Sequence, residues 1–254
     1  MGKKTKKILL EIRQELKRNV DPTYKKGEIR FFKEPIKTYG VRVPATRRIS
    51  RKYWQRVKGL GKQEIFCFCE ELLKSGYMQE ATIAFAWALR LQNQYEEKDG
   101  KVFYSWLRKY VSNWVKCDDF CTRAFGSFVF QFPEFLFQLN VWAKSKNRWL
   151  KRASAVILIY SVRKEKHLNK IFEISDILLE DEDDMVRKGY GWALKEAGNQ
   201  YQDRVFKYVM KRKHKMPRVA FRYAIEKMPP KMKKQAMEKT KNPLSRPALT
   251  QRDG

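Results

Sequence analysis

The sequence predicts an all-α protein in which pairs of helices repeat along a solenoid. Three observations predict this class. Apolar residues recur at helical spacing along most of the 254 residues, no segment alternates convincingly as a strand does, and similar helical segments return at nearly constant offsets. The alternative is an irregular bundle of helices, in which these similar segments would have no common structural role.

Eight segments have the apolar periodicity of helices, and short breaks rich in glycine and proline separate them. The first ends at Gly76, and glycine is a frequent helix stop. In chain order the predicted helices span Lys62–Gly76, Gln79–Gln92, Lys101–Trp114, Phe120–Phe130, Trp149–Ser161, Leu168–Leu179, Met185–Ala197 and Arg204–Lys211.

Two of these helices share a pattern of a basic pair followed by small and apolar residues. WLKRASAVILIYS at 149–161 aligns with MVRKGYGWALKEA at 185–197, at an offset of 36 residues. A further shift of 32 residues brings Val219–Met228 into the same register, and Gln79–Leu91 is a weaker copy upstream. Helix pairs that repeat every 35 to 45 residues or so are typical of a HEAT-like α-solenoid. The second helices of successive pairs then line one concave face, which suits a long ligand such as duplex DNA.

Charge and composition suggest how the chain is organised and what it binds. We expect one HEAT-like helical-repeat domain at residues 8–240, a basic arm at residues 1–7 and a disordered tail at residues 241–254. The formal net charge is +28, and the acidic residues gather at 176–184 (DILLEDEDD), expected to be a solvated loop that keeps one face off DNA. Such a surplus favours a polyanion, with nucleic acid first and an anionic membrane second, unless the charge serves solubility alone.

Several classes of protein are excluded or disfavoured. The longest apolar stretch, Ala153–Tyr160, is well short of the roughly 18 residues that a membrane span needs. No signal peptide follows the basic Met1–Lys7, so we expect an intracellular protein, in the cytoplasm and associated with the nucleoid. The 4 cysteines form no C-x-x-C pair and the 2 histidines are far apart, so we expect no metal and no cofactor.

Four residues at repeat spacing form the candidate site. Trp114 and Asp118 are four residues apart and therefore share a helix face. Asp118 stands 34 residues before Arg152, and Arg152 stands 40 residues before Trp192, so three successive repeats can bring all four to one concave surface. Each residue also has a structural interpretation: a core tryptophan, an aspartate that caps a helix, or an Asp–Arg ladder between repeats.

At these residues the sequence resembles the HEAT-like alkylpurine DNA glycosylases of the AlkD type. The resemblance runs from about Arg30 to Ala197. It rests on Trp114 with Asp118, WLKRA at 149–153, GWALKE at 191–196 and YGVRVPATRR at 39–48. It implies an enzyme that excises N3- and N7-alkylpurines from duplex DNA without a deep base-flipping pocket. Its catalytic aspartate is then Asp118, with Trp114, Arg152 and Trp192 around it.

These residue types suit that chemistry. Alkylation at N3 or N7 makes the purine cationic and a good leaving group, and breaking its bond to C1′ leaves an oxocarbenium-like sugar. A carboxylate about 4 Å from that charge contributes on the order of 4 kcal/mol at an effective dielectric constant of about 20, roughly a thousandfold in rate. Asp118 can also position the attacking water, and the two indoles can pack against the sugar as charge builds. Arg152 is expected to hold the neighbouring phosphate and to lower the pKa of Asp118.

The remaining site residues concern DNA contact and substrate range. Arg42 is a candidate for the minor groove opposite the lesion. The family has a tyrosine and a lysine near the lesion, and here these fall at Phe31 and Tyr160. Basic residues near predicted helix starts are the candidates for phosphate contact, namely Arg47, Arg48, Arg148, Lys151, Arg187, Lys188 and Arg218.

Two other functions stay open at this point. One is a non-catalytic helical-repeat protein that binds branched or damaged DNA, and the other is a scaffold for an acidic protein. For the glycosylase we expect a monofunctional, monomeric enzyme without an obligate protein partner or a membrane, since the motif places no lysine for a lyase step.

Overall fold

The computed structural model describes residues 3–238, which are helical apart from short connections. The predicted all-α class is confirmed. In the described part of the chain the only β structure is one isolated bridge, between Lys37 and Tyr77. The expected tail at residues 241–254 lies outside the described residues.

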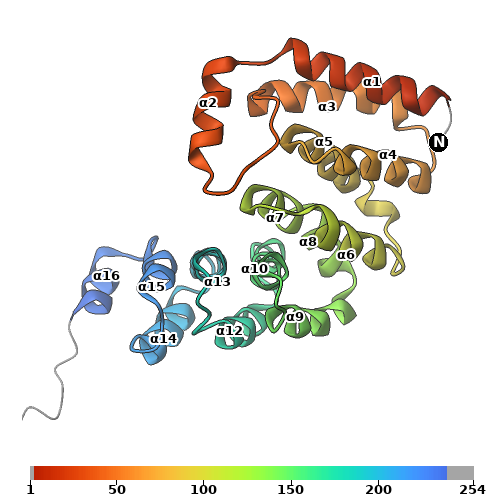
Figure 1. The fold of residues 1–254 in the computed structure, drawn as a ribbon. Helices are drawn as coiled ribbons and strands as arrows, with labels where there is room; N and C mark the ends of the chain where they lie inside the picture. Colours follow the sequence, from red (N-terminus) through yellow and green to blue (C-terminus); the bar gives the residue numbers. More distant parts are fainter. Residues whose placement is uncertain (1–2, 239–254) are drawn as a thin grey trace, which may run out of the picture.

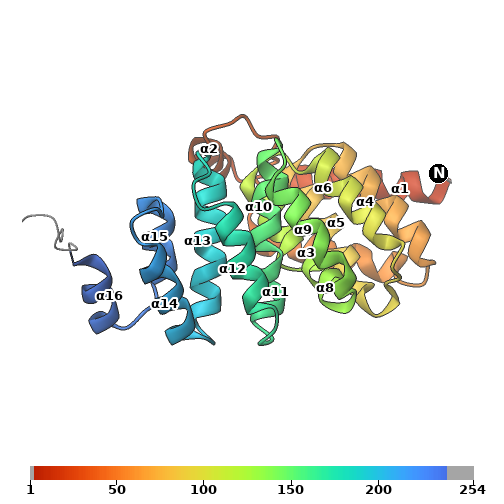
Figure 2. The same cartoon turned by 90° about the horizontal axis from the view of Figure 1, so that it is seen from below.

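The helices form two rows that follow an arc (Figure 1). The inner row consists of α3 (Val43–Val57), α5 (Met78–Arg90), α7 (Trp114–Cys121), α10 (Arg148–Val156), α13 (Asp184–Gly198) and α15 (Arg218–Ile225). The outer row consists of α1 (Lys3–Arg18), α4 (Lys62–Lys74), α6 (Asp99–Tyr110), α9 (Leu136–Ala143), α12 (Leu168–Ile177) and α14 (Gln202–Arg212). The other described segments are α2 (Pro22–Phe31), η1 (Gln92–Gln94), α8 (Ala124–Gln131), η2 (Pro133–Phe135), α11 (Leu158–Val162) and α16 (Pro230–Met237). Figure 2 shows the successive pairs lying side by side from α1 to α16.

The inner helices confirm the repeat. Their first residues are spaced by 35, 36, 34, 36 and 34 positions along the chain. The predicted offset of 36 is therefore found between α10 and α13. The predicted offset of 32 for the last repeat is two residues too short, because α15 begins 34 residues after α13.

Some predicted helix bounds are wrong for local reasons. The helix expected at 101–114 ends at Tyr110, and Trp114 instead opens α7, because the Asn113 side chain caps that helix by accepting a hydrogen bond from the Lys116 backbone N–H (3.0 Å). The helices expected at 120–130 and 149–161 are each interrupted, at residues 122–123 and at Ile157. Residues 3–7 of the expected basic arm form the start of α1, where buried Thr5 precedes Ile8 in the core.

Consecutive inner helices pack on one another and enclose a continuous core rich in aromatic side chains. Trp87, Trp106 and Phe103 are among its largest fully buried members. Two inner helices approach closely at Gly191 on α13, where an added Cβ would stand 2.8 Å from the Ala220 carbonyl oxygen on α15. The α2 helix differs from the rest: it lies across one end of the arc, and none of its ten described residues is buried. This arrangement places the beginnings of α7, α10 and α13 opposite the end of α2.

Candidate functional site

An open cavity of about 540 Å³ lies where α7, α10 and α13 face the end of α2. It brings together all four residues singled out at repeat spacing, Trp114, Asp118, Arg152 and Trp192. The described residues that line it are Phe31, Lys33, Glu34, Trp114, Asp118, Arg148, Arg152, Asp184, Met185, Lys188, Trp192, Lys195 and Tyr223. The repeat therefore places residues from three inner helices around one space, as expected.

The centre of the cavity is an ion pair between Asp118 on α7 and Arg152 on α10. Arg152 Nε donates to Asp118 Oδ1 and Nη2 donates to Oδ2, each at 2.8 Å. Its third nitrogen, Nη1, donates to the backbone carbonyl of Met185 on α13. The guanidinium thus fixes the carboxylate plane and connects three inner helices, and it is only 6% exposed. That burial leaves little surface for the phosphate contact expected of Arg152 and favours a positioning role.

The electrostatics of Asp118 differ from the expectation. Burial raises the pKa of Asp118 above its usual value, and the hydrogen bonds and charge of Arg152, which act in the opposite direction, do not cancel this effect. The expected lowering of this pKa is therefore wrong, because desolvation outweighs the attraction of the guanidinium. Asp118 still faces the cavity, with 16% of its side chain exposed.

Aromatic side chains line the cavity beside the carboxylate. Trp114 stacks on Phe32 (ring centroids 5.6 Å apart, 23° between planes) and meets the ring of Phe31 edge-on at 5.7 Å. Trp192 lies on α13, and its Nε1–H donates to Glu196 Oε1 at 3.0 Å, which fixes the indole. Both indoles are only partly buried and so remain available to a ligand in the cavity.

The acidic segment is not a solvated loop held away from the basic face, as we expected. Its carboxylates pair with cations predicted to bind phosphate: Asp183 with Arg148 (2.7 Å), Asp184 with Lys188 (2.7 Å) and Asp181 with Lys151. The Asp181 backbone carbonyl also accepts a hydrogen bond from Arg187. The acidic segment lies close to these cations because it leads directly into α13, where the Asp183 side chain caps the helix.

One of these cations also bridges distant parts of the chain. Arg148 Nη1 donates to Glu34 Oε1 at 2.7 Å, which joins α10 to the connection after α2. Both residues of the pair line the cavity.

The other candidates for DNA contact lie further along the inner row. Arg47 and Arg48 are exposed on α3, and Arg48 donates to the Asn19 side chain at 3.2 Å. Arg42 pairs with Asp21 (2.8 Å) and lies over the Tyr24 ring, with 62% of its side chain exposed. Arg218 is exposed at the start of α15 and forms no ion pair with a described carboxylate.

The two residues expected near the lesion have different positions. Phe31 lines the cavity and is 68% exposed. Tyr160 is not among the described residues that line it; its ring meets Phe130 of α8 edge-on at 5.8 Å. Helix geometry explains this, because Tyr160 stands eight residues beyond Arg152 along the α10–α11 direction, roughly 12 Å at about 1.5 Å per residue. Tyr160 therefore lies apart from the four residues that the cavity brings together.

Sequence reasoning missed several residues of the cavity. Tyr223 stands 35 residues after Lys188, so the repeat spacing contained a signal for it. Lys33 and Glu34 of the lining carried no such signal, and neither did Phe32, which stacks on Trp114 but is not among the described lining residues. All three belong to an irregular connection that only the fold brings to α7 and α10.

The fold and the site define the class of protein: an all-α helical-repeat chain with a carboxylate, its guanidinium partner and two indoles in one cavity. The model of the DNA alkylation repair enzyme family matches residues 12–228, so the chain belongs to that family. Membership supports a role in DNA repair and implies DNA as the substrate.

Two solved structures are similar to the chain. One is described as a predicted DNA alkylation repair enzyme from Enterococcus faecalis, with 15% identity over 83% of this chain and 97% of that chain and a TM-score of 0.73. The other is smu.31 from Streptococcus mutans UA159, with 19% identity, 69% and 89% coverage and a TM-score of 0.54. At such low identity the likeness shows the fold. The search of curated proteins gives no significant match.

Two further findings concern residues 3–238. No helix among them is long and apolar enough to cross a membrane. Nor does any group of three or more His, Cys, Asp or Glu side chains in this part have an arrangement that could hold a metal ion.

Proposed function

We propose that the protein is a monofunctional DNA glycosylase that removes cationic N3- and N7-alkylpurines, such as 7-methylguanine and 3-methyladenine, from duplex DNA. The observation that carries the proposal is the Asp118 carboxylate, held by Arg152 and exposed to a cavity that Trp114 and Trp192 also line. The lesion supplies its own leaving group, so this site needs a fixed negative charge and a water molecule rather than a metal or a general acid.

The steps follow from that arrangement. The bond between C1′ and the purine nitrogen breaks, and its electron pair moves onto the base and neutralises it. The positive charge that develops on the sugar meets the Asp118 carboxylate and the faces of the two indoles. Water adds to C1′ and loses a proton to Asp118 or to solvent, which leaves a free base and an abasic site. Arg152 acts through Asp118 as a positioning residue, while Arg148 and Lys188 at the rim are the candidates for phosphate contact.

A second function is favoured by one observation. Both oxygens of Asp118 are occupied by Arg152, which is also how an Asp–Arg ladder between structural repeats would look. A protein that binds branched or damaged DNA without excision fits that geometry. The exposure of Asp118 to the cavity favours the enzyme.

The test is the release of 7-methylguanine from a duplex that carries a single such base, at one salt concentration. Asp118→Asn should abolish most of the release and leave DNA affinity nearly unchanged, because the amide keeps the shape and loses the charge. Asp119→Asn is a matched control, since Asp119 is also largely buried, also bound to an arginine (Arg123, 2.8 Å), and not part of the cavity lining. Tight binding without release by the wild type would favour the non-catalytic function instead.

A further inference from the structure

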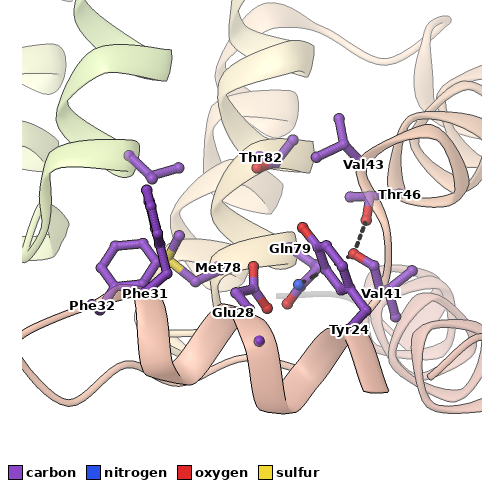
Figure 3. Close-up of a pocket in the computed structure, with 12 residues that line it drawn as sticks. Tyr24, Glu28, Phe31, Phe32, Val41, Val43, Thr46, Met78, Gln79 and Thr82 are labelled. Atoms are coloured by element: carbon purple, nitrogen blue, oxygen red, sulfur yellow. Dashed lines mark hydrogen bonds between the residues drawn. The ribbon is translucent and has the colours of Figure 1, made fainter. Parts of the chain in front are cut away.

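A second pocket, of about 440 Å³, lies between α2 and the inner helices α3 and α5 (Figure 3). Phe31 forms a wall of both this pocket and the cavity around Asp118, so the two spaces adjoin. Its volume lies within the range of roughly 300–1,000 Å³ typical of small-molecule sites. The lining residues are Tyr24, Gly27, Glu28, Phe31, Phe32, Val41, Val43, Thr46, Met78, Gln79, Thr82 and Val115.

One acidic side chain stands in this apolar pocket. Figure 3 shows Glu28 rising from α2 between Phe31 and Tyr24, toward Met78 and Gln79 on α5. Glu28 Oε2 accepts a hydrogen bond from Thr38 Oγ1, which fixes the carboxylate, whereas Oε1 accepts none from the described residues. Gln79, the other long polar side chain, is committed to the backbone, since its Oε1 accepts from the Tyr39 N–H at 3.0 Å. The pocket therefore offers aromatic surface and one available anionic acceptor.

This combination suits a flat ring with hydrogen-bond donors on one edge. Phenyl and phenol rings stack on aromatic heterocycles, and a carboxylate accepts strongly from N–H groups in the plane of such a ring. Guanine-type bases carry adjacent N1–H and N2–H donors on one edge. Adenine-type bases carry an amino donor beside the N1 lone pair, which a carboxylate repels.

We propose that the pocket beneath α2 binds the excised base and selects 7-alkylguanine over 3-alkyladenine. The proposal rests on the glycosylase function, since that reaction supplies the free base, which enters the pocket only after it has left the duplex. Glu28 is the specificity-determining residue, because it alone presents an anionic acceptor among the described residues of the lining. Tyr24, Phe31 and Phe32 supply the aromatic surface.

The test is calorimetric titration of the full-length protein with free 7-methylguanine and, separately, with free 3-methyladenine. Wild type should bind 7-methylguanine saturably and at least roughly tenfold more tightly than 3-methyladenine. Glu28→Gln keeps the shape of the side chain and should weaken 7-methylguanine binding by roughly tenfold or more, the size expected for a lost hydrogen bond to a charged acceptor. Phe31→Ala should also weaken it, and a side chain that is 68% exposed can be truncated without unfolding the protein.

Two control variants distinguish base binding in this pocket from effects at the Asp118 cavity. Glu34→Gln removes a carboxylate that lines the Asp118 cavity rather than this pocket and should leave base binding unchanged. Asp118→Asn should also bind the base normally, so failure of excision and failure of base binding are distinct results. Unsaturable binding by folded wild type, equal affinity for the two bases, or unchanged affinity in Glu28→Gln would each overturn the proposal.

Discussion

Arg152 holds both carboxylate oxygens of Asp118 at 2.8 Å and, through its third nitrogen, the carbonyl of Met185. Three consecutive inner helices are thus joined at one guanidinium. Because the pair is largely buried, the same contact influences the stability of the fold and the chemistry of the carboxylate.

Replacing Arg152 with methionine should destabilise the protein strongly. Removal of one partner leaves the Asp118 carboxylate largely buried without compensation, which costs about 3 kcal/mol or more in the free energy of unfolding. Urea unfolding measures the loss. Arg42→Met is the control: Arg42 and its partner Asp21 have side chains that are 62% and 32% exposed, so its loss should cost about 1 kcal/mol or less. Similar losses in both variants would contradict the role given to the Asp118–Arg152 pair.

The excision rate should fall on acidification, with a midpoint above 3.8, the ordinary pKa of an aspartate side chain. The reaction needs the Asp118 carboxylate, and burial raises the pKa of this group. Stability should depend on pH in the opposite direction to the excision rate. Because the pKa of Asp118 is higher in the folded state than in the unfolded state, its contribution to the free energy of unfolding is present at low pH and is lost as pH rises through the folded pKa. Initial rates of 7-methylguanine release, corrected for a protein-free duplex, give the profile. A midpoint below 3.8 would show that Arg152 outweighs burial.

Removing the acidic partner of a basic residue on α10 or α13 should tighten DNA binding. Asp181 pairs with Lys151 and Asp184 pairs with Lys188, so changing either aspartate to asparagine frees one cation for phosphate. Each change should steepen the slope of log affinity against log salt by about one. Glu182→Gln removes the same charge from a residue that forms no ion pair among those described, and should leave the slope nearly unchanged. Equal slopes for all three variants would mean that only net charge matters.

Gly191→Ala should lower the melting temperature. The added Cβ would lie 2.8 Å from the Ala220 carbonyl oxygen and 2.9 Å from Tyr223 Cβ, so α13 and α15 must separate, at a cost of about 1–3 kcal/mol. Gly198→Ala, in the same helix, meets its nearest atom only at 4.0 Å and should leave stability unchanged or slightly raised. Thermal unfolding followed by circular dichroism compares the two, and an unchanged melting temperature for Gly191→Ala would argue against close packing at this position.

The sequence was sufficient for the class of fold and for the convergence of four residues. The repeat spacing predicts positions well, since each inner helix begins 34 to 36 residues after the one before it. A residue at a given place in one repeat therefore predicts the place of its counterpart in the next. Trp114, Asp118, Arg152 and Trp192 meet for this reason.

What the sequence did not predict depends on interactions outside the repeat. Glu34 belongs to an irregular connection, and its partner Arg148 stands 114 residues away. No local sequence pattern therefore predicts this ion pair. The acidic segment looked like a solvated loop because composition alone does not reveal that Asp183 caps α13 and so brings its neighbours to the cavity. Tyr160 does not line the cavity but contacts Phe130, and a family position transferred along the sequence does not reveal the geometry of the helix that carries it.

The exposed α2 helix should be one of the least stable parts of the fold. A helix with none of its ten described residues buried opens at little cost, so its amide protons should exchange with solvent long before those of α5, most of whose residues are buried. Phe31 ends that helix and forms a wall of both hollow spaces. A local opening of α2 would therefore change the shape of both cavities at once.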